Sequence, residues 1–172
     1  MKYTILIIIS LLSVNFAVLA ESSETKINRA MAAAPPSISQ QATILDSDGQ
    51  VLQKGTNDWT CMPDTMPGDK APMCNDALWM EMMSAVGSKA DFKAKGIGIS
   101  YMLKGDIGSG VSNATPYHPD HKKAHDYTET GPHLMIIVPK EMLKGITRDP
   151  QSGGPFVMWG DTPYAHIMVP IK

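Results

Sequence analysis

The chain has 172 residues, of which 43% are hydrophobic and 19% charged, and its formal net charge at pH 7 is −2. Its 15 basic residues are outnumbered by 17 acidic ones and form no basic patch. This composition argues against nucleic acid or an anionic membrane surface as a partner. The length suits one domain with a hydrophobic core of its own.

Residues 1–20 have the three parts of a cleavable secretory signal peptide. Lys2 gives a positive start, an apolar run follows, and Val18 and Ala20 occupy positions −3 and −1 of a small-residue cleavage site. The apolar run covers about 15 residues, fewer than the roughly 20 that a membrane-spanning helix needs. We therefore expect a periplasmic or secreted protein with no stable membrane insertion after cleavage.

The segment that follows divides into a leader and a domain. Residues 21–37 are polar, then rich in alanine, and end at two prolines, so we expect a flexible leader with one helical turn at most. Residues 38–172 are expected to form a single domain. It begins with short predicted strands at 42–45 and 50–53, which flank a glycine-bearing turn and suit a hairpin.

The chain has two cysteines, Cys61 and Cys74, which flank a short loop with three prolines and one glycine. In an exported protein this pair would meet an oxidising compartment, where disulfides persist. A redox pair is usually Cys-x-x-Cys, and a thiolate metal site usually offers more ligands at closer spacing. We therefore expect a structural disulfide around a loop with little regular structure.

One amphipathic helix is predicted after this loop. Asn75 resembles an N-cap, and Gly87 resembles a stop signal. Between them, apolar residues recur at spacings of three and four and form one face; they are Leu78, Trp79, Met82, Met83 and Val86.

The C-terminal half carries the strand signals. Alternating residues predict a strand over 97–104, and a buried apolar run predicts another over 134–138. Segments 156–159 and 164–169 are expected to form a closing hairpin. Irregular structure is expected over residues 105 to 131 and one helical turn over residues 141 to 146. The sum is an α+β domain with a mainly antiparallel sheet and one principal helix, stapled by one disulfide.

All five histidines lie in this half, and three of them cluster. If Pro119 opens a short helix, His121 and His125 share a face and could grip a divalent ion such as Zn, with His118 and Asp120 nearby. The alternative is a solvated loop between strands.

His133 and His166 differ from this cluster because each lies at or inside a predicted strand. If the two strands are neighbours, both imidazoles could face one pocket and serve in acid–base chemistry or metal binding. The alternative is that each is a half-buried histidine with one hydrogen bond. Aromatic residues would complete the pocket, which is expected to comprise Trp59, Tyr101, His133, Trp159, Tyr164 and His166.

Methionine is over-used, with 13 in the chain. Met62, Met66 and Met73 lie in the cysteine loop, where they are harder to bury than those of the helix. Thioethers are soft ligands that suit Cu(I), whereas the ordinary role of methionine is to fill cores. The sequence establishes no cofactor, and copper or zinc is the alternative that the methionines and histidines leave open.

Five segments resemble an uncharacterised family of small exported bacterial proteins: WTCMPD, PMC, GISYML, TGPH and PYAHIMVP. The resemblance covers about residues 38 to 172 and implies a single exported domain, with no catalytic residues to carry over. The chain lacks Gly-x-Ser-x-Gly, and neither cysteine is expected to be free. Binding of an unidentified small molecule or protein is therefore favoured over catalysis. The alternatives are an enzyme that uses His133, His166 and Tyr164, and a Cu- or Zn-binding protein.

Overall fold

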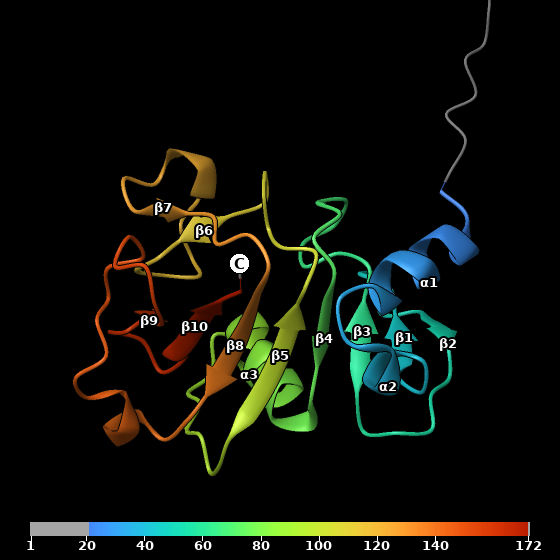
Figure 1. Cartoon of the computed structure of the whole chain (residues 1–172), viewed down its shortest axis with the longest axis horizontal. Helices are drawn as coiled ribbons and strands as arrows, with labels where there is room; N and C mark the ends of the chain where they lie inside the picture. The colour runs from blue at the N-terminus through green and yellow to red at the C-terminus, as the bar shows by residue number, and fades with distance from the viewer. Residues whose placement is uncertain (1–20, 172) are drawn as a thin grey trace, which may run out of the picture.

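The computed structural model describes residues 21–171, so the predicted signal peptide lies outside the described residues. They form a main sheet with the order β2-β1-β3-β4-β5-β8-β10-β9 and a small sheet of β6 and β7 (Figure 1). The predicted α+β class, with a mainly antiparallel sheet, one principal helix and one disulfide, is confirmed. The elements are α1 (Ser23–Met31), α2 (Pro36–Ser39), β1 (Thr43–Leu45), β2 (Val51–Gln53), β3 (Thr60–Met62), β4 (Met73–Asn75), α3 (Ala77–Ser88), β5 (Gly98–Met102), β6 (Val111–Ser112), β7 (Tyr127–Thr128), β8 (His133–Ile137), β9 (Phe156–Met158) and β10 (His166–Pro170), with 3-10 turns η1 (His121–Lys123) and η2 (Lys140–Leu143).

Both predicted hairpins form. β1 pairs antiparallel with β2, and β9 pairs antiparallel with β10. Within the described part of the sheet, the pairing of β1 with β3 is the one parallel ladder. The region between β5 and β8, expected to be irregular, contains the small β6–β7 sheet and η1, which project beyond the main sheet (Figure 1).

The principal helix α3 begins one residue later than expected. Asp76 is the N-cap, because its Oδ1 accepts from the backbone N–H of Trp79 at 2.8 Å. Its Oδ2 accepts from the N–H of Ile99 at 2.6 Å and so ties the helix to β5. Asn75 belongs to β4 instead, fully buried. The helix passes Gly87 and ends at Ser88, and its C-cap Lys89 adopts the left-handed conformation with φ 55°.

The expected flexible leader is a helix in the structure. Ala30 of α1 and Ala33, which follows the helix, are fully buried in the core. Arg29 fixes the helix to the β3–β4 loop by donating to the carbonyl of Pro63 and to the carboxylate of Asp64, at 2.9 and 3.0 Å. The alanine-rich segment was expected to be flexible, but its small side chains allow a helix to pack closely on the sheet.

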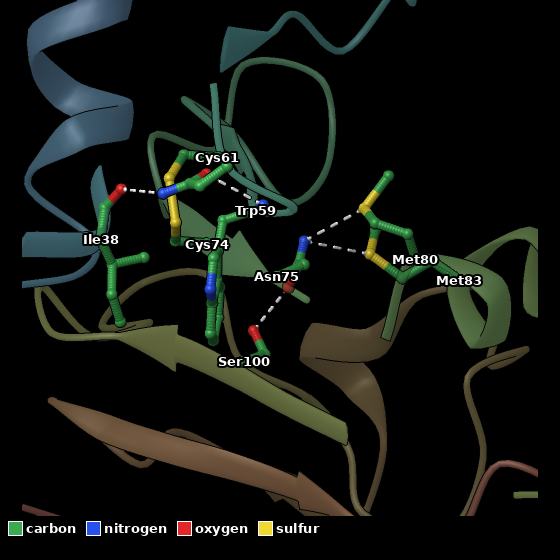
Figure 2. Close-up of a disulfide and its surroundings, with 9 residues drawn as sticks. Ile38, Trp59, Cys61, Cys74, Asn75, Met80, Met83 and Ser100 are labelled. Carbon is green, nitrogen blue, oxygen red and sulfur yellow. Dashed lines mark hydrogen bonds between the residues drawn. A yellow bond between two sulfur atoms is a disulfide. The ribbon is translucent and has the colours of Figure 1, made fainter. Parts of the chain in front are cut away.

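The disulfide joins two strands that the sequence did not indicate. Cys61 of β3 and Cys74 of β4 are directly opposite each other in the antiparallel ladder, and their sulfurs are bonded (Figure 2). Trp59 and Ile38 lie close to the bridge (Figure 2). The loop between the cysteines is therefore a hairpin connection.

The main sheet separates its side chains into two faces. The cysteines, Ile44, Ala30 of α1 and the alanines that follow this helix pack on one face. On the other, α3 covers a methionine-rich core that includes Trp79, Met82 and Met168. No helix within residues 21–171 is long and apolar enough to cross a membrane.

Candidate functional site

A cavity of about 220 Å³ lies between α3 and the sheet. Its walls combine methionines with histidines and tryptophans, and a few polar side chains complete them. The face of β4, β5, β8, β9 and β10 that packs on α3 supplies Met73, Met102, His133, Met135, Met158, His166 and Met168. The helix α3 supplies Trp79, Met82, Met83 and Val86. β6 supplies Val111, η1 supplies His121, and loops supply Thr65, Met66, Asp106, Ser109, Pro116 and Trp159.

His133 and His166 both line this cavity, from the neighbouring strands β8 and β10. In the register, His133 lies opposite Pro170, four residues along β10 from His166. Four residues of strand span about 13 Å. The backbone positions of the two histidines therefore lie at opposite ends of the ladder, and the two rings are not hydrogen-bonded to each other.

Each histidine is fixed by one backbone hydrogen bond. The Nδ1 of His133 lies 2.5 Å from the carbonyl oxygen of Gly131, and that of His166 lies 2.9 Å from the carbonyl oxygen of Tyr164. A carbonyl can only accept, so each Nδ1 carries the proton and each neutral ring keeps a lone pair on Nε2. Both side chains are only 1% exposed, and neither Nε2 has a hydrogen-bond partner on the protein.

Burial keeps both rings neutral. It lowers the pKa of His166 to about 4, an effect that the carbonyl of Tyr164 opposes and that repulsion from His133 reinforces. Burial also lowers the pKa of His133, against the opposing effects of the Gly131 carbonyl and the Asp106 carboxylate. At neutral pH the two Nε2 atoms are therefore acceptors or metal ligands, not donors.

Two tryptophans enclose His166. The rings of Trp79 and Trp159 meet it edge to face, with centroids 5.1 and 5.0 Å away. The Nε1–H of Trp159 donates to the carbonyl of Ser112 at 3.0 Å, whereas that of Trp79 is buried without a partner on the protein. Aromatic walls of this kind exclude water from the imidazole.

A chain of contacts holds His133 in place. The Oδ1 of Asp106 accepts from the N–H groups of Thr130 and Gly131, both at 2.8 Å. Gly131 in turn presents its carbonyl to His133. Gly105 has φ 75° and lies against Gly131. A Cβ added to Gly105 would be 2.5 Å from the carbonyl carbon of Gly131. A glycine is needed here for both its conformation and its small size.

Three of the six predicted pocket residues lie elsewhere. Trp59 and Tyr101 pack against each other, with centroids 5.5 Å apart, beside the disulfide on the opposite face of the sheet. Tyr164 is buried, and its hydroxyl donates to the carbonyl of Ala90 at 2.7 Å. The structure brings Trp159 to the cavity together with His133 and His166.

The predicted metal ligands are also divided. Met66, Met73 and His121 line the cavity, whereas Met62 packs at the border of the core. Met66 is 37% exposed and His121 is partly exposed, so both lie toward solvent.

The histidine cluster does not share a helical face. η1 ends at Lys123 and Ala124 is extended, so His125 turns away and is exposed. Asp120 pairs with Lys123 at 2.8 Å. Within residues 21–171, no group of three or more His, Cys, Asp or Glu side chains is arranged to hold a metal ion.

The other polar groups on the cavity wall are already engaged. Thr65 donates its hydroxyl to the carbonyl of Ala71, and Ser109 donates its hydroxyl to the carbonyl of Asp69. The Nδ1 of His121 accepts from the N–H of Ser112 at 3.1 Å. None of these hydroxyls donates to a basic group, so the described cavity holds no activated nucleophile.

Several site residues were missed by sequence reasoning, notably Met102, Met135, Met158 and Met168. One signal was present: a methionine follows each buried histidine at the second position, as in His133-Leu-Met135 and His166-Ile-Met168. In a strand, residues two apart share a face. Comparisons with protein-family models, with curated proteins and with solved structures find no match for this chain.

Proposed function

We propose that this protein is an exported binding protein that holds a small ligand in the cavity between α3 and the sheet. One observation carries the proposal: two buried histidines line the cavity, and the Nε2 atom of each has no partner on the protein. A buried polar atom left unsatisfied costs about 1–3 kcal/mol. A ligand that offers a hydrogen-bond donor or a metal ion to these atoms would recover that energy.

The size and lining of the cavity favour a compact and largely apolar ligand. Engineered apolar cavities of about 150 Å³ accept benzene, and this one measures about 220 Å³. Binding is favoured over catalysis, because the hydroxyls on the wall are engaged with backbone carbonyls. The imidazoles then give the ligand its orientation, and the methionines adapt to its shape.

Phenol tests this function, because it combines an apolar ring of the right size with one hydroxyl donor. The full chain is expressed with residues 1–20, the predicted signal peptide, and is purified without a histidine tag. It is then titrated with phenol while tryptophan fluorescence and the imidazole ¹⁵N resonances are followed. We expect phenol to quench Trp79 and Trp159 and to shift an Nε2 resonance. Replacing both histidines by leucine removes the one hydrogen bond that the phenol hydroxyl can donate and should weaken phenol binding about tenfold.

The exposed residue His125 provides the matched control, and His125→Ala should bind phenol like the wild type. The proposed function is wrong if neither phenol nor a soft metal ion perturbs the resonances of His133 or His166.

A further inference from the structure

Methionine is concentrated on the cavity wall beyond the needs of an apolar lining. Eight methionines line the cavity, against two valines and no leucine or isoleucine. Apolar cores are normally built from leucine, isoleucine, valine and phenylalanine, with methionine as an occasional filler. Thioethers gathered around two unpartnered imidazoles therefore indicate ligation as well as packing.

The strand register places thioethers beside both imidazoles. Met102 lies directly opposite His133, and Met158 lies directly opposite His166. Opposite residues in an antiparallel sheet have Cβ atoms about 5 Å apart. A third pair, Met135 and Met168, occupies the register position between the two histidines and faces the same cavity.

The helix α3 contributes two more methionines to the cavity wall, Met82 and Met83. The amide of Asn75 donates to the sulfurs of Met80 and Met83, both at 3.6 Å, while its Oδ1 accepts from Ser100 at 2.6 Å (Figure 2). Figure 2 shows this amide between the helix and the sheet. A buried polar link thus fixes the helix over the thioethers.

This set of donors selects among metals. Soft thioether ligands favour Cu(I), imidazole suits copper as well as zinc, and hard ions such as Mg²⁺ and Ca²⁺ require oxygen ligands. The carboxylate of Asp106 lines the same cavity and would offset part of the charge of a monovalent ion, although its Oδ1 already accepts two backbone hydrogen bonds. A backbone carbonyl on Nδ1 is also the usual support of a histidine that ligates through Nε2.

We propose that the cavity is a Cu(I) site in which each histidine works with its neighbouring methionines. One ion binds the Nε2 of His166 with the sulfurs of Met158 and Met168. A second ion binds the Nε2 of His133 with the sulfurs of Met102 and Met135. Met66 lies toward solvent on the cavity wall and is not one of these ligands. The two histidines lie at opposite ends of the β8–β10 ladder, so each has its own neighbouring methionines. This proposal rests on the proposed binding function and, of the two kinds of ligand named there, assigns the metal ion.

The test is Cu(I) binding by the full chain, under anaerobic and reducing conditions, in competition with the chromophoric chelator bicinchoninate. Ag(I), a redox-inert analogue, is counted by native mass spectrometry. We expect two ions per chain, with sulfur and nitrogen neighbours in the X-ray absorption spectrum of the copper form. Zn(II) should not compete.

Methionine-to-leucine pairs locate the ions while nearly conserving volume. Met158→Leu with Met168→Leu should remove the ion at His166, and Met102→Leu with Met135→Leu the one at His133, each with at least a tenfold loss of affinity. Met142→Leu is the control, because Met142 is 56% exposed and does not line the cavity.

Phenol separates failure of the copper site from failure of the binding function. If phenol binds and neither Cu(I) nor Ag(I) does, the copper site is wrong and the binding function stands. If neither the metals nor phenol bind, both proposals are wrong. If both double variants bind copper with wild-type affinity, the assignment of the methionines as ligands is wrong. If only one of the two double variants loses a copper ion, the site proposed at the other histidine is wrong.

Discussion

Acid should destabilise the metal-free protein through His166 in particular. The ordinary pKa of histidine is 6.5, whereas burial lowers that of His166 to about 4 in the folded protein. Between these two values the unfolded chain binds a proton that the folded protein excludes, so the free energy of unfolding falls as the pH falls. The stability due to this neutral ring is fully present above pH 6.5 and is lost progressively toward pH 4.

The magnitude follows from the two pKa values. Each pH unit over which the unfolded state alone is protonated costs about 1.4 kcal/mol. Acidification from pH 7 to pH 4 should therefore cost about 3 kcal/mol through His166. This is a large share of the roughly 5–15 kcal/mol that stabilises an ordinary domain.

Urea unfolding of the wild type and of His166→Leu, at pH 7, 6, 5 and 4, measures this loss. The carboxylates add their own acid sensitivity, as where Lys26 lowers the pKa of Asp46. That contribution is shared by both proteins and cancels in the difference. The wild type should lose about 3 kcal/mol more than the variant, and His125→Ala should behave like the wild type. Equal losses of stability in the two proteins, or an NMR titration of His166 near pH 6.5, would contradict a buried neutral His166.

Three further changes test the fold. Replacing Cys61 and Cys74 by alanine should cost about 3 kcal/mol in the chain-entropy description of a loop this size; urea unfolding measures it, and an unchanged midpoint would contradict it. Asp76→Ala removes the cap of α3 and should cost about 1–2 kcal/mol, whereas a melting temperature equal to that of the wild type would show that the cap is dispensable. Gly105→Ala forces a side chain into a left-handed, crowded position, with a destabilisation of at least about 1 kcal/mol and a shifted imidazole resonance of His133; an unchanged resonance would count against the support described for that ring.

The strand and helix signals that succeeded are local ones. The spacing of Leu78, Trp79 and Met82 indicates α3, and alternation around Tyr101 indicates β5, since each pattern needs only neighbouring residues. β3 and β4 could not be predicted in this way. Each has three residues, and they are strands because Cys61 and Cys74 pair across the ladder.

The site was predictable in part. His133 and His166 stood out because each lies in a strand segment, and the structure has them on neighbouring strands. Their separation along the ladder depends on a register that is fixed by long-range packing. Tyr101 shows the limit of the method: its own strand was predicted, but its position in the alternation turns it to the opposite face from Met102.

The position of the disulfide has a consequence for local unfolding. β3 and β4 pair over three residues, whereas β5 and β8 pair over five. This three-residue ladder and the hydrogen bond from the N–H of Leu103 to the carbonyl of Ala33 form a seam between the unit of α1, α2 and β1 to β3 and the rest of the sheet. Cooperative subunits of a fold can open independently of one another, with their own amide exchange rates. A covalent bond across the seam couples the two units. While the disulfide is intact, the core amides of the N-terminal unit and of the cavity half should exchange at a common rate. Once the disulfide is reduced, the two sets of amides should exchange at different rates.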